Sequence, residues 1–343
     1  MPDLTQRPCW VGVDTSNYTT SAAVTTEDEQ GRLTVVANHK IPLPVAAGAR
    51  GLRQSDAVFA HIKNLPAITA QLRETLQAGN YRIAAVGYSA TPRDVVGSYM
   101  PCFLTGEVAA KALAAGAEAE AYPFSHQSGH IMAALYSSGY MAQNRSSDKP
   151  FMAFHVSGGT TEAVIAQPRR DGFDITLIGG GADLHAGQVI DRVGVLMGLD
   201  FPCGKAMEDL AAAYLADRHI TGIRPCVRDG VCHLSGVENQ AAKRWQDTAD
   251  RGEVSALVLT FIGKTLRLMT DQLQEKIKAT YGYLPVIYAG GVMSNRLIRP
   301  LLSDATPWQT YFAEPAFSAD NAAGTSLLCA LRDRESRPPV GLV

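Results

Sequence analysis

Two histidines four residues apart, His126 and His130, are the residues whose side chains and spacing best suit metal binding. Residues 131–136 follow them without a helix breaker and with apolar side chains at helical spacing, which predicts a helix. If that helix begins at the pair, both imidazoles lie on one face, one turn apart, where they can bind one divalent metal. The alternative is two unrelated surface histidines, since eight histidines make such a spacing by chance plausible.

Zinc peptidases use this spacing in the pattern His-Glu-x-x-His, in which the glutamate is the general base. Here the second residue is Gln127, whose amide cannot accept a proton at neutral pH. No other residue stands out as a general base, so the catalytic residues stay unknown from the sequence. A peptidase is therefore the least favoured interpretation of the histidine pair.

Two polar turns follow apolar strands at the head of each half of the chain. The strand expected at residues 10–13 ends in the turn 14–20, and the strand at 151–156 ends in the turn 157–161. Each turn leads into a return strand. Two such hairpins facing each other would offer backbone N–H groups and hydroxyls to a phosphate chain. The alternative is two ordinary hairpins.

Strands and helices alternate along the rest of the chain, which is typical of an α/β protein. Further strands are expected at 34–39, 84–89, 119–123, 173–178, 285–289 and 310–313, and helices at 55–76, 106–115, 188–197, 206–216 and 254–280. Ser55 is a plausible N-cap of the first helix, and residues 220–239 are expected to be irregular. Asp320 lies near the start of a terminal helix, where its carboxylate can cap the helix or bind a metal.

Length and composition set the class of protein. A chain of 343 residues with 46% hydrophobic and 19% charged residues fits two lobes with large cores. A net charge of -2 provides no general field for nucleic acid, so partners or a local patch would supply basic surface. The six cysteines form no Cys-x-x-Cys pair, and no signal peptide or membrane-spanning run is visible. We therefore expect a cytoplasmic protein with reduced thiols and no membrane partner.

Four motifs in order resemble one known family. They are His-Gln-x-Gly-His at 126–130, Val-Ser-Gly-Gly-Thr-Thr at 156–161, Ala-Gly-Gly-Val-x-x-Asn-Arg at 289–296 and Ala-Asp-Asn at 319–321. This series is similar to the TsaD-type (YgjD-like) tRNA threonylcarbamoyladenosine transferases, formerly called O-sialoglycoprotein endopeptidases. The resemblance runs from about residue 11 to residue 331, nearly the whole chain.

The resemblance implies an α/β, two-lobed actin-like ATPase (ASKHA) fold with duplicated ribonuclease-H-like lobes. It predicts a first lobe at 1–125 plus 315–343 and a second lobe at 126–314. A metal and nucleotide site is then expected in the cleft between the lobes.

The resemblance also implies a set of metal ligands. Its positions match His126, His130 and Asp320. The residue before Val-Ser-Gly-Gly is a tyrosine ligand in archaeal-type relatives and is His155 here, so we expect His155 to join the site. Imidazoles and a carboxylate suit zinc or iron. The alternative is that His155 is a structural histidine within its strand.

An adenine nucleotide (ATP, AMP or an acyl-adenylate) is implied along the second hairpin. The family positions that contact it match Val156, Ser157, Gly158, Gly159, Asp191, Gly204, Glu208 and Asn295. Asp191 and Glu208 can accept hydrogen bonds from ribose hydroxyls. The alternative for these two residues is a solvated helix carboxylate.

Several positions depart from the family pattern. The first hairpin, Asp14–Thr20, lacks the two later acids of the usual tip, and Thr160 replaces the usual His or Asn. A usual lysine is Glu238, which reverses a charge, and the usual Gly-Pro-Gly loop is Thr91–Asp94. These changes suit a divergent paralogue, and they leave the acceptor open between tRNA and another molecule.

The expected function is metal-dependent transfer of a threonylcarbamoyl (carbamoyl-type) group from an acyl-adenylate, in the family to adenosine of tRNA. One divalent metal would act as a Lewis acid, and amides of residues 157–159 would stabilise the oxyanion or the leaving AMP. The alternatives are a carbamoyltransferase for a small molecule and a nucleotide-binding, non-catalytic partner. Expected partners are tRNA through other proteins, and a TsaB-like homologue or a second copy.

Overall fold

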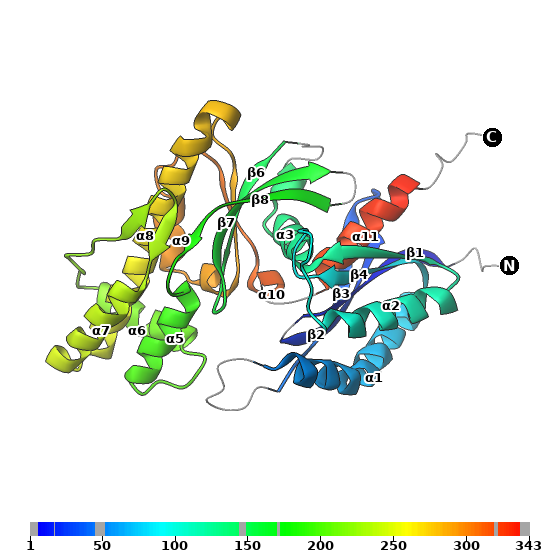
Figure 1. Cartoon of the computed structure of the whole chain (residues 1–343), viewed down its shortest axis with the longest axis horizontal. Coiled ribbons are helices and arrows are strands. Elements are labelled where there is room, and N and C mark those ends of the chain that lie inside the picture. The colour runs from blue at the N-terminus through cyan, green and yellow to red at the C-terminus, as the bar shows by residue number, and fades with distance from the viewer. Residues whose placement is uncertain are drawn as a thin grey trace. The chain divides into compact units, whose positions relative to one another are not determined.

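The computed structural model describes residues 6–16, 18–44, 52–143, 149–169, 172–318 and 322–336. Their contacts divide the chain into two compact units (Figure 1). Unit 1 is Met1–Tyr136, Pro168–Asp174 and Ala319–Val343, and unit 2 is Ser137–Gln167 and Ile175–Ser318.

The sheet of unit 1 has five strands in the order β3-β2-β1-β4-β5. The strands are β1 (Arg7–Thr15), β2 (Thr19–Glu27), β3 (Leu33–Pro42), β4 (Tyr81–Thr91) and β5 (Glu120–Ser125). β2 runs antiparallel to β1, while β4 lies parallel to β1 on the other side and β5 parallel to β4. Residues 9–16 are all buried, as expected for a central strand with both faces covered.

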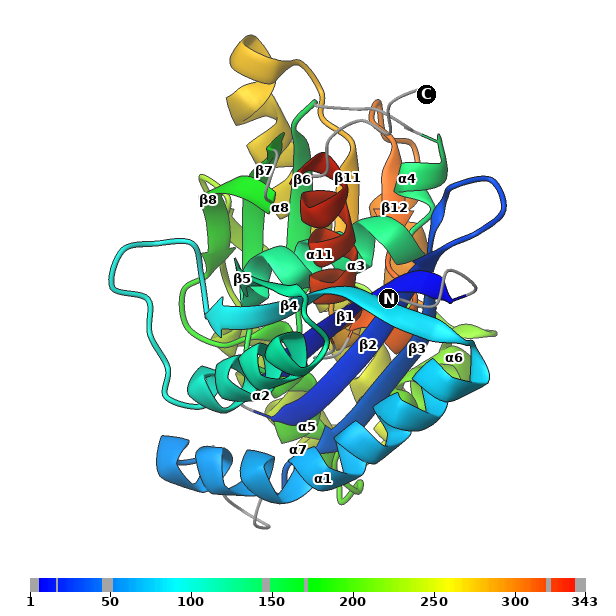
Figure 2. The same cartoon turned by 90° about the vertical axis from the view of Figure 1, so that its right-hand side faces the viewer.

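Helices cover both faces of this sheet. They are α1 (Gln54–Ala78), α2 (Phe103–Gly116), α3 (His126–Ser137) and α11 (Ala323–Ser336). Val11 and Val13 pack in one core cluster with residues of α1 and α2. Gly12, which points to the opposite face, lies directly under Ser326 of α11. Figure 2 shows α11 and the pair α1 and α2 on opposite faces of the sheet.

The sheet of unit 2 repeats the same order and adds two short strands. Its order is β12-β11-β6-β7-β8-β10-β9. The strands are β6 (Phe151–Val156), β7 (Thr161–Arg169), β8 (Gly172–Gly181), β9 (Cys226–Arg228), β10 (Val231–His233), β11 (Val286–Ala289) and β12 (Thr310–Phe312). β7 is antiparallel to β6, β11 is parallel to β6, and β12 is parallel to β11, as in unit 1. The expected duplication of the lobes is confirmed.

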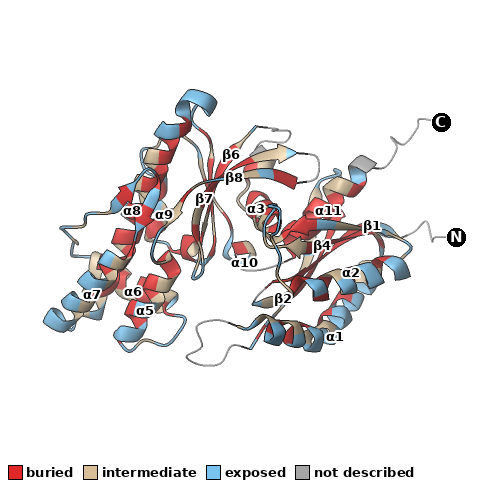
Figure 3. Ribbon diagram, in the orientation of Figure 1, coloured by how far each residue is buried: buried red, intermediate tan, exposed pale blue. Residues whose placement is uncertain are grey.

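The helices of unit 2 are α4 (Tyr140–Gln143), α5 (Ala186–Leu196), α6 (Gly204–Leu215), α7 (Ser235–Thr248), α8 (Arg251–Tyr281), the 3-10 turn η1 (Gly291–Ser294), α9 (Ile298–Ser303) and α10 (Pro315–Ser318). Helices α5 to α9 form a large apolar core with one face of the sheet, whereas Tyr140 of α4 contacts Phe151 and Tyr311 outside that core. Met152, Phe154 and Val156 of β6 join side chains of α5, α6 and α8 in the core. Buried residues follow the strands and the inner faces of these helices (Figure 3).

Two local expectations are wrong. Residues 220–239 are not simply irregular, because they contain β9, β10 and the start of α7. Helix α1 begins at Gln54 after Arg53, and no side chain caps it, so Ser55 is not its N-cap. All six cysteines lie in the described ranges and are free thiols, and burial raises the pKa of Cys9 and of Cys232 to about 12. In the described part of the chain, no helix has the length and apolarity to cross a membrane.

Candidate functional site

Helix α3 starts at His126 because serine and aspartate side chains hold its first turn. The Ser125 hydroxyl accepts a hydrogen bond from the Ser128 N–H at 3.0 Å, as an N-cap does. The Ser125 and Ser128 hydroxyls both donate to Oδ2 of Asp94, at 2.7 and 2.8 Å. The Gln127 N–H donates to the Pro92 carbonyl at 3.1 Å. The turn that departs from the family pattern therefore anchors the histidine helix.

A crossing of two glycines brings α11 against α3. A Cβ built on Gly324 would overlap the carbonyl oxygen of Gly129, and one built on Gly129 would lie 3.0 Å from Oγ1 of Thr325. This close approach places α3 in unit 1. The boundary between the units therefore falls after Tyr136, whereas the sequence had predicted it before His126. Asp320, which precedes α11 in the sequence, lies outside the described residues.

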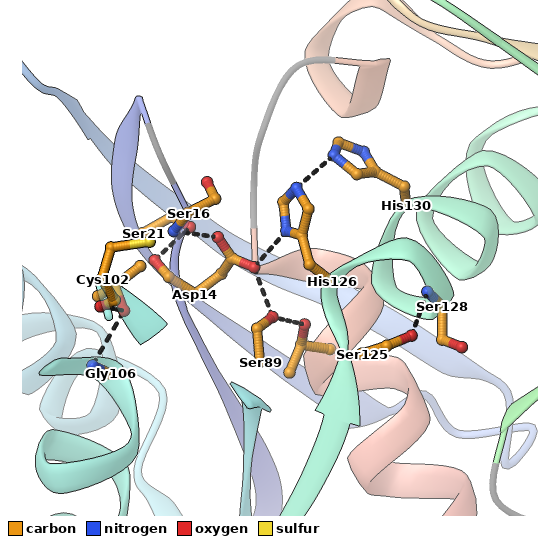
Figure 4. Close-up of polar contacts among 12 residues, drawn as sticks. Asp14, Ser16, Ser21, Ser89, Cys102, Gly106, Ser125, His126, Ser128 and His130 are labelled. Atoms are coloured by element: carbon orange, nitrogen blue, oxygen red, sulfur yellow. Dashed lines mark hydrogen bonds and ion pairs between the residues drawn. The ribbon is translucent and has the colours of Figure 1, made fainter. Parts of the chain in front are cut away.

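The histidine pair lies on one face of α3, as its spacing predicts. Nε2 of His130 lies 2.9 Å from Nε2 of His126, and the two rings meet edge to face (Figure 4). Nδ1 of His126 lies 2.7 Å from Oδ2 of Asp14. The two Nε2 atoms are therefore hydrogen-bonded to each other, and a cation shared by both imidazoles would take the place of the hydrogen between them.

Asp14 is the next-to-last residue of β1 and is only 1% exposed. Its Oδ2 accepts a hydrogen bond from the Ser89 hydroxyl at 2.5 Å, and its Oδ1 accepts one from the Ser16 N–H at 3.0 Å (Figure 4). β1 and β4 are parallel neighbours, so their carboxyl ends meet and bring Asp14 and Ser89 together. The sequence identified Asp14 only as part of a polar tip, and its contact with His126 was missed.

A buried histidine of α1 fixes the same hairpin tip from behind. Nε2 of His61 lies 2.8 Å from the Ser16 carbonyl oxygen, which can only accept, so Nε2 carries the proton. Nδ1 of His61 then accepts from the Thr20 hydroxyl at 2.8 Å, and that hydroxyl accepts from Asn64 at 3.1 Å. Burial lowers the pKa of His61. The His61 ring thus bonds to Ser16 and to Thr20, one on each strand side of the first hairpin.

The other two expected ligands remain predictions. His155 lies in unit 2 on β6, where Phe154 and Val156 point into the core, so its side chain lies on the opposite face of that sheet. Asp320 is not described. Within the described ranges, no group of three or more His, Cys, Asp or Glu residues is placed to hold a metal. The structure therefore brings His126 and His130 together and does not test the full set.

The tip of the second hairpin in unit 2 presents bare backbone. The Ser157 N–H donates to the Thr160 carbonyl at 2.8 Å, and the Ser157 carbonyl accepts from the Gly187 N–H at 3.0 Å, which seats the start of α5 against the tip. Gly158 and Gly159 are exposed. The Val156 side chain is in the core, so Val156 can offer only its backbone to a ligand.

Asp191 is connected to Gly204 through Cys203, the residue that precedes Gly204 in the chain. Oδ1 of Asp191, on α5, accepts a hydrogen bond from the Cys203 N–H at 2.9 Å, and Gly204 then begins α6. Burial raises the pKa of Asp191, and the Cys203 N–H opposes this by lowering it. The carboxylate is half-buried and anchors the start of α6.

Glu208 and Asn295 both make structural contacts. Glu208 is 6% exposed and accepts from the backbone N–H and the Nε of Arg296, at 2.8 and 2.6 Å. Oδ1 of Asn295 accepts from the N–H groups of Leu297 and Ile298, which caps α9. These bonds occupy part of the acceptor capacity that a ribose would need, and they connect α6 to the segment after β11.

Contacts connect all eight expected nucleotide residues into one end of unit 2. The tip of the hairpin touches α5, Asp191 of α5 holds the start of α6, and Glu208 of α6 holds Arg296. The segment after β11 returns to the hairpin at Gly290, where an added Cβ would overlap the Val156 carbonyl oxygen. We call this end, with its residues Val156, Ser157, Gly158, Gly159, Gly187, Asp191, Gly204, Glu208, Gly290, Gly291, Asn295 and Arg296, the backbone ring.

Four glycines of the backbone ring have open space around them. A Cβ on Gly158, Gly159, Gly204 or Gly291 would meet nothing within 4 Å, and none of the four has a positive φ. Neither packing nor backbone conformation requires glycine there, and a glycine costs roughly 1 kcal/mol relative to alanine where it lies in a helix. Backbone kept bare in this way allows a ligand to approach closely.

Comparison with known families decides what this arrangement belongs to. Residues 44–327 match the family described as TsaD, tRNA N6-adenosine threonylcarbamoyltransferase. The chain belongs to the TsaD family. At the level of the family, this supports an enzyme of tRNA threonylcarbamoyl transfer. The match spans most of the chain and includes the histidine pair and the backbone ring.

Solved structures similar to this TsaD-family chain have an actin-like ATPase fold, as expected. One is component A of the (R)-2-hydroxyglutaryl-CoA dehydratase of Acidaminococcus fermentans, with TM-score 0.50, 12% identity and coverage of 95% of this chain and 99% of that one. Another is the activator of the 2-hydroxyisocaproyl-CoA dehydratase of Clostridium difficile with bound ADPNP, with TM-score 0.49, 12% identity and 97% and 99% coverage. The ethanolamine utilization protein EutJ of Carboxydothermus hydrogenoformans has TM-score 0.44, 16% identity and 96% and 91% coverage. At 12% identity the first of these structures bears on the fold alone, and nothing is inferred from the other two, whose TM-scores are under 0.5.

Proposed function

We propose that this TsaD-family chain transfers a threonylcarbamoyl group from an acyl-adenylate to the N6 amine of adenosine in tRNA, with the help of a divalent metal. The observation that carries the proposal is the backbone ring, where four glycines leave open space beside a half-buried carboxylate. Bare amides and a carboxylate match the phosphate and ribose of an adenylate.

The reaction makes one bond and breaks one. The acceptor amine attacks the carbamoyl carbon, a C–N bond forms, the C–O bond to the phosphate breaks, and AMP leaves; the amine proton passes to the phosphate of the leaving AMP or to water. The Ser157 N–H already donates to Thr160, so it is not free to stabilise negative charge. Among described residues no hydrogen bond engages the Gly158 N–H, which we propose as the donor to the oxyanion or to AMP.

The metal proposal rests on the histidine pair. Two imidazole nitrogens side by side on one helix face are ligands that zinc or iron accepts once the hydrogen between them is displaced, and we propose that Asp320 and His155 complete the site. A bound cation would supply Lewis-acid polarisation of the carbamoyl carbonyl. The chain itself contributes orientation, because α3 is anchored by Asp94 and by the glycine crossing with α11.

The test combines binding and turnover. Purified protein is titrated with AMP and ATP by calorimetry, then incubated with tRNA, threonine, bicarbonate, ATP and the enzymes that make the acyl-adenylate. We expect nucleotide binding and modified adenosine. Gly158→Val should weaken nucleotide binding by about ten-fold, or ~1.4 kcal/mol, because the side chain enters the open space. Gly116→Ala is the matched control, since Gly116 also has open space around it but ends α2 in unit 1. Absence of nucleotide binding by the wild-type protein would overturn the proposal.

A second candidate is transfer to a small-molecule amine. The observation that favours it is the ion pair between Nε of Arg192 and Oε1 of Glu238, at 2.7 Å. This pair neutralises a cation one residue from Asp191, where a tRNA phosphate would need positive charge. Turnover of the acyl-adenylate with small amines but not with tRNA would select this candidate. Nucleotide and metal binding without any turnover would select a non-catalytic partner.

The partners belong to the same proposal. We propose that tRNA reaches the protein with the help of other proteins, because the net charge is -2. We propose further that the chain works with a TsaB-like homologue or as a dimer. Light scattering of the purified chain distinguishes these, since a monomer alone would favour a heterologous partner and a dimer would favour self-association.

A further inference from the structure

The contact between Asp14 and His126 determines where the proton of His126 resides. An ionised carboxylate oxygen only accepts hydrogen bonds, so Nδ1 of His126, 2.7 Å from Oδ2, must carry the hydrogen. A neutral ring protonated at Nδ1 has its lone pair at Nε2, the atom that faces His130. We propose that Asp14 is a positioning residue that fixes this tautomer and thereby makes Nε2 of His126 a cation ligand. The inference rests on the proposed metal site.

Asp14 is held rigidly enough to do this. The Ser89 hydroxyl and the Ser16 N–H donate to its two oxygens, and the residue is 1% exposed. Because both donors point at fixed lone pairs, the carboxylate cannot rotate away from the imidazole. A buried carboxylate that orients a metal-binding histidine typically raises metal affinity by a factor of 10 to 100.

A second layer supports the carboxylate. His61 donates from Nε2 to the Ser16 carbonyl, and the Ser16 N–H donates to Asp14. One continuous series of hydrogen bonds therefore runs from α1 through the hairpin tip to α3. His61 therefore supports the carboxylate through Ser16.

Asp94 provides a matched comparison. Both carboxylates bind the first turn of α3, but Asp94 contacts the hydroxyls of Ser125 and Ser128, and Asp14 contacts the imidazole. If carboxylates matter here only because they hold the helix, changing either to asparagine should have the same effect. If Asp14 selects the tautomer, only its replacement should move the proton of His126.

Asp14→Asn keeps the shape of the side chain and replaces one acceptor oxygen with an NH2 group that donates. The amide oxygen can still accept from the Ser16 N–H, which leaves the NH2 group facing His126 and Ser89. An NH2 group donates, so Nδ1 of His126 must become the acceptor and the hydrogen moves to Nε2. In a serine-protease triad the same Asp-to-Asn change leaves the geometry intact and gives the wrong tautomer.

The experiment reads the tautomer directly in protein freed of metal and nucleotide. The protein is labelled with 15N in its imidazoles, long-range 1H–15N spectra are recorded at neutral pH, and His126→Gln assigns the His126 signals. Wild type and Asp94→Asn should show hydrogen on Nδ1, and Asp14→Asn should show it on Nε2. Equilibrium dialysis with Zn2+ should then show affinity about 10 to 100 times lower for Asp14→Asn than for Asp94→Asn.

Several results would overturn the inference. The wild-type spectrum alone decides against it if Nε2 of His126 carries a hydrogen, whether or not Asp14→Asn folds. An unchanged tautomer in a folded Asp14→Asn variant, or a changed one in Asp94→Asn, would also contradict it. If the tautomer behaves as expected but wild type binds no Zn2+, the proposed metal function fails while the effect of Asp14 on the tautomer stands.

Discussion

Replacing Gly324 by alanine tests the glycine crossing that positions the histidine helix. The added Cβ would overlap the Gly129 carbonyl oxygen and lie 2.9 Å from the Ala133 nitrogen. All of these neighbours are helix backbone and cannot turn aside as a side chain does, so α3 and α11 must separate. Overpacking of this kind costs about 1–3 kcal/mol, and we expect the upper end.

Thermal unfolding followed by circular dichroism measures the cost. For a unit of this size, ~3 kcal/mol corresponds to a lowering of Tm by roughly 6–12 °C. Zn2+ affinity should fall as well, because displacement of α3 moves the two imidazoles. Gly116→Ala is the control: a Cβ there meets open space at the end of α2, so Tm should stay equal or rise slightly. A Gly324→Ala variant with the Tm and Zn2+ affinity of wild type would refute the reasoning.

Three further changes have expected outcomes. Burial lowers the pKa of His61 below its usual 6.5, so the unfolded chain binds the proton more tightly than the folded protein does. The stabilisation should be complete above about pH 6.5 and should be lost as the pH falls through the folded-state pKa. Denaturant melts of His61→Gln should show a smaller loss of stability over that pH range. Arg296→Gln removes the Nε donor to Glu208, which is 6% exposed, and should lower the free energy of unfolding by about 1–3 kcal/mol in urea melts, whereas an unchanged value would show that the backbone N–H alone satisfies the carboxylate. Glu238→Lys breaks a largely exposed ion pair with Arg192 and should change stability by less than about 1 kcal/mol. The same variant should bind tRNA more tightly in a filter assay at low salt, and unchanged binding would argue that this surface does not meet the acceptor.

The features predicted best from the sequence are those that a local pattern of residues determines. Alternating apolar runs identified both hairpins, and helical spacing placed His126 and His130 on one face of α3. The segment 220–239 was misjudged because β9 and β10 have three residues each, too short for a periodic pattern, and α7 buries only Val237 and Ala241. Its mostly polar helix gives no apolar stripe to detect.

The supporting contacts of the site could not be predicted because they join distant residues. Asp14 and His126 are 112 positions apart, and His61 lies 45 positions from Ser16. Whether such residues meet depends on strand order and helix packing, and neither is encoded in spacing. Asp94 shows the same limit, since its turn was read only as a departure from the family pattern and in fact holds the start of α3.

The duplicated fold explains how one scaffold can provide two kinds of chemistry. β1 and β6 occupy the same place in sheets of the same order, and each leads into a polar hairpin tip. After β6 the tip is Ser157 and two exposed glycines that offer mainly backbone, whereas near the end of β1 lies the buried carboxylate of Asp14. Backbone amides suit an anionic phosphate, and a carboxylate suits an imidazole that must present a lone pair. In the proposed function, the residue type near the end of one strand decides which half of the chain would orient a cation ligand and which would bind a nucleotide.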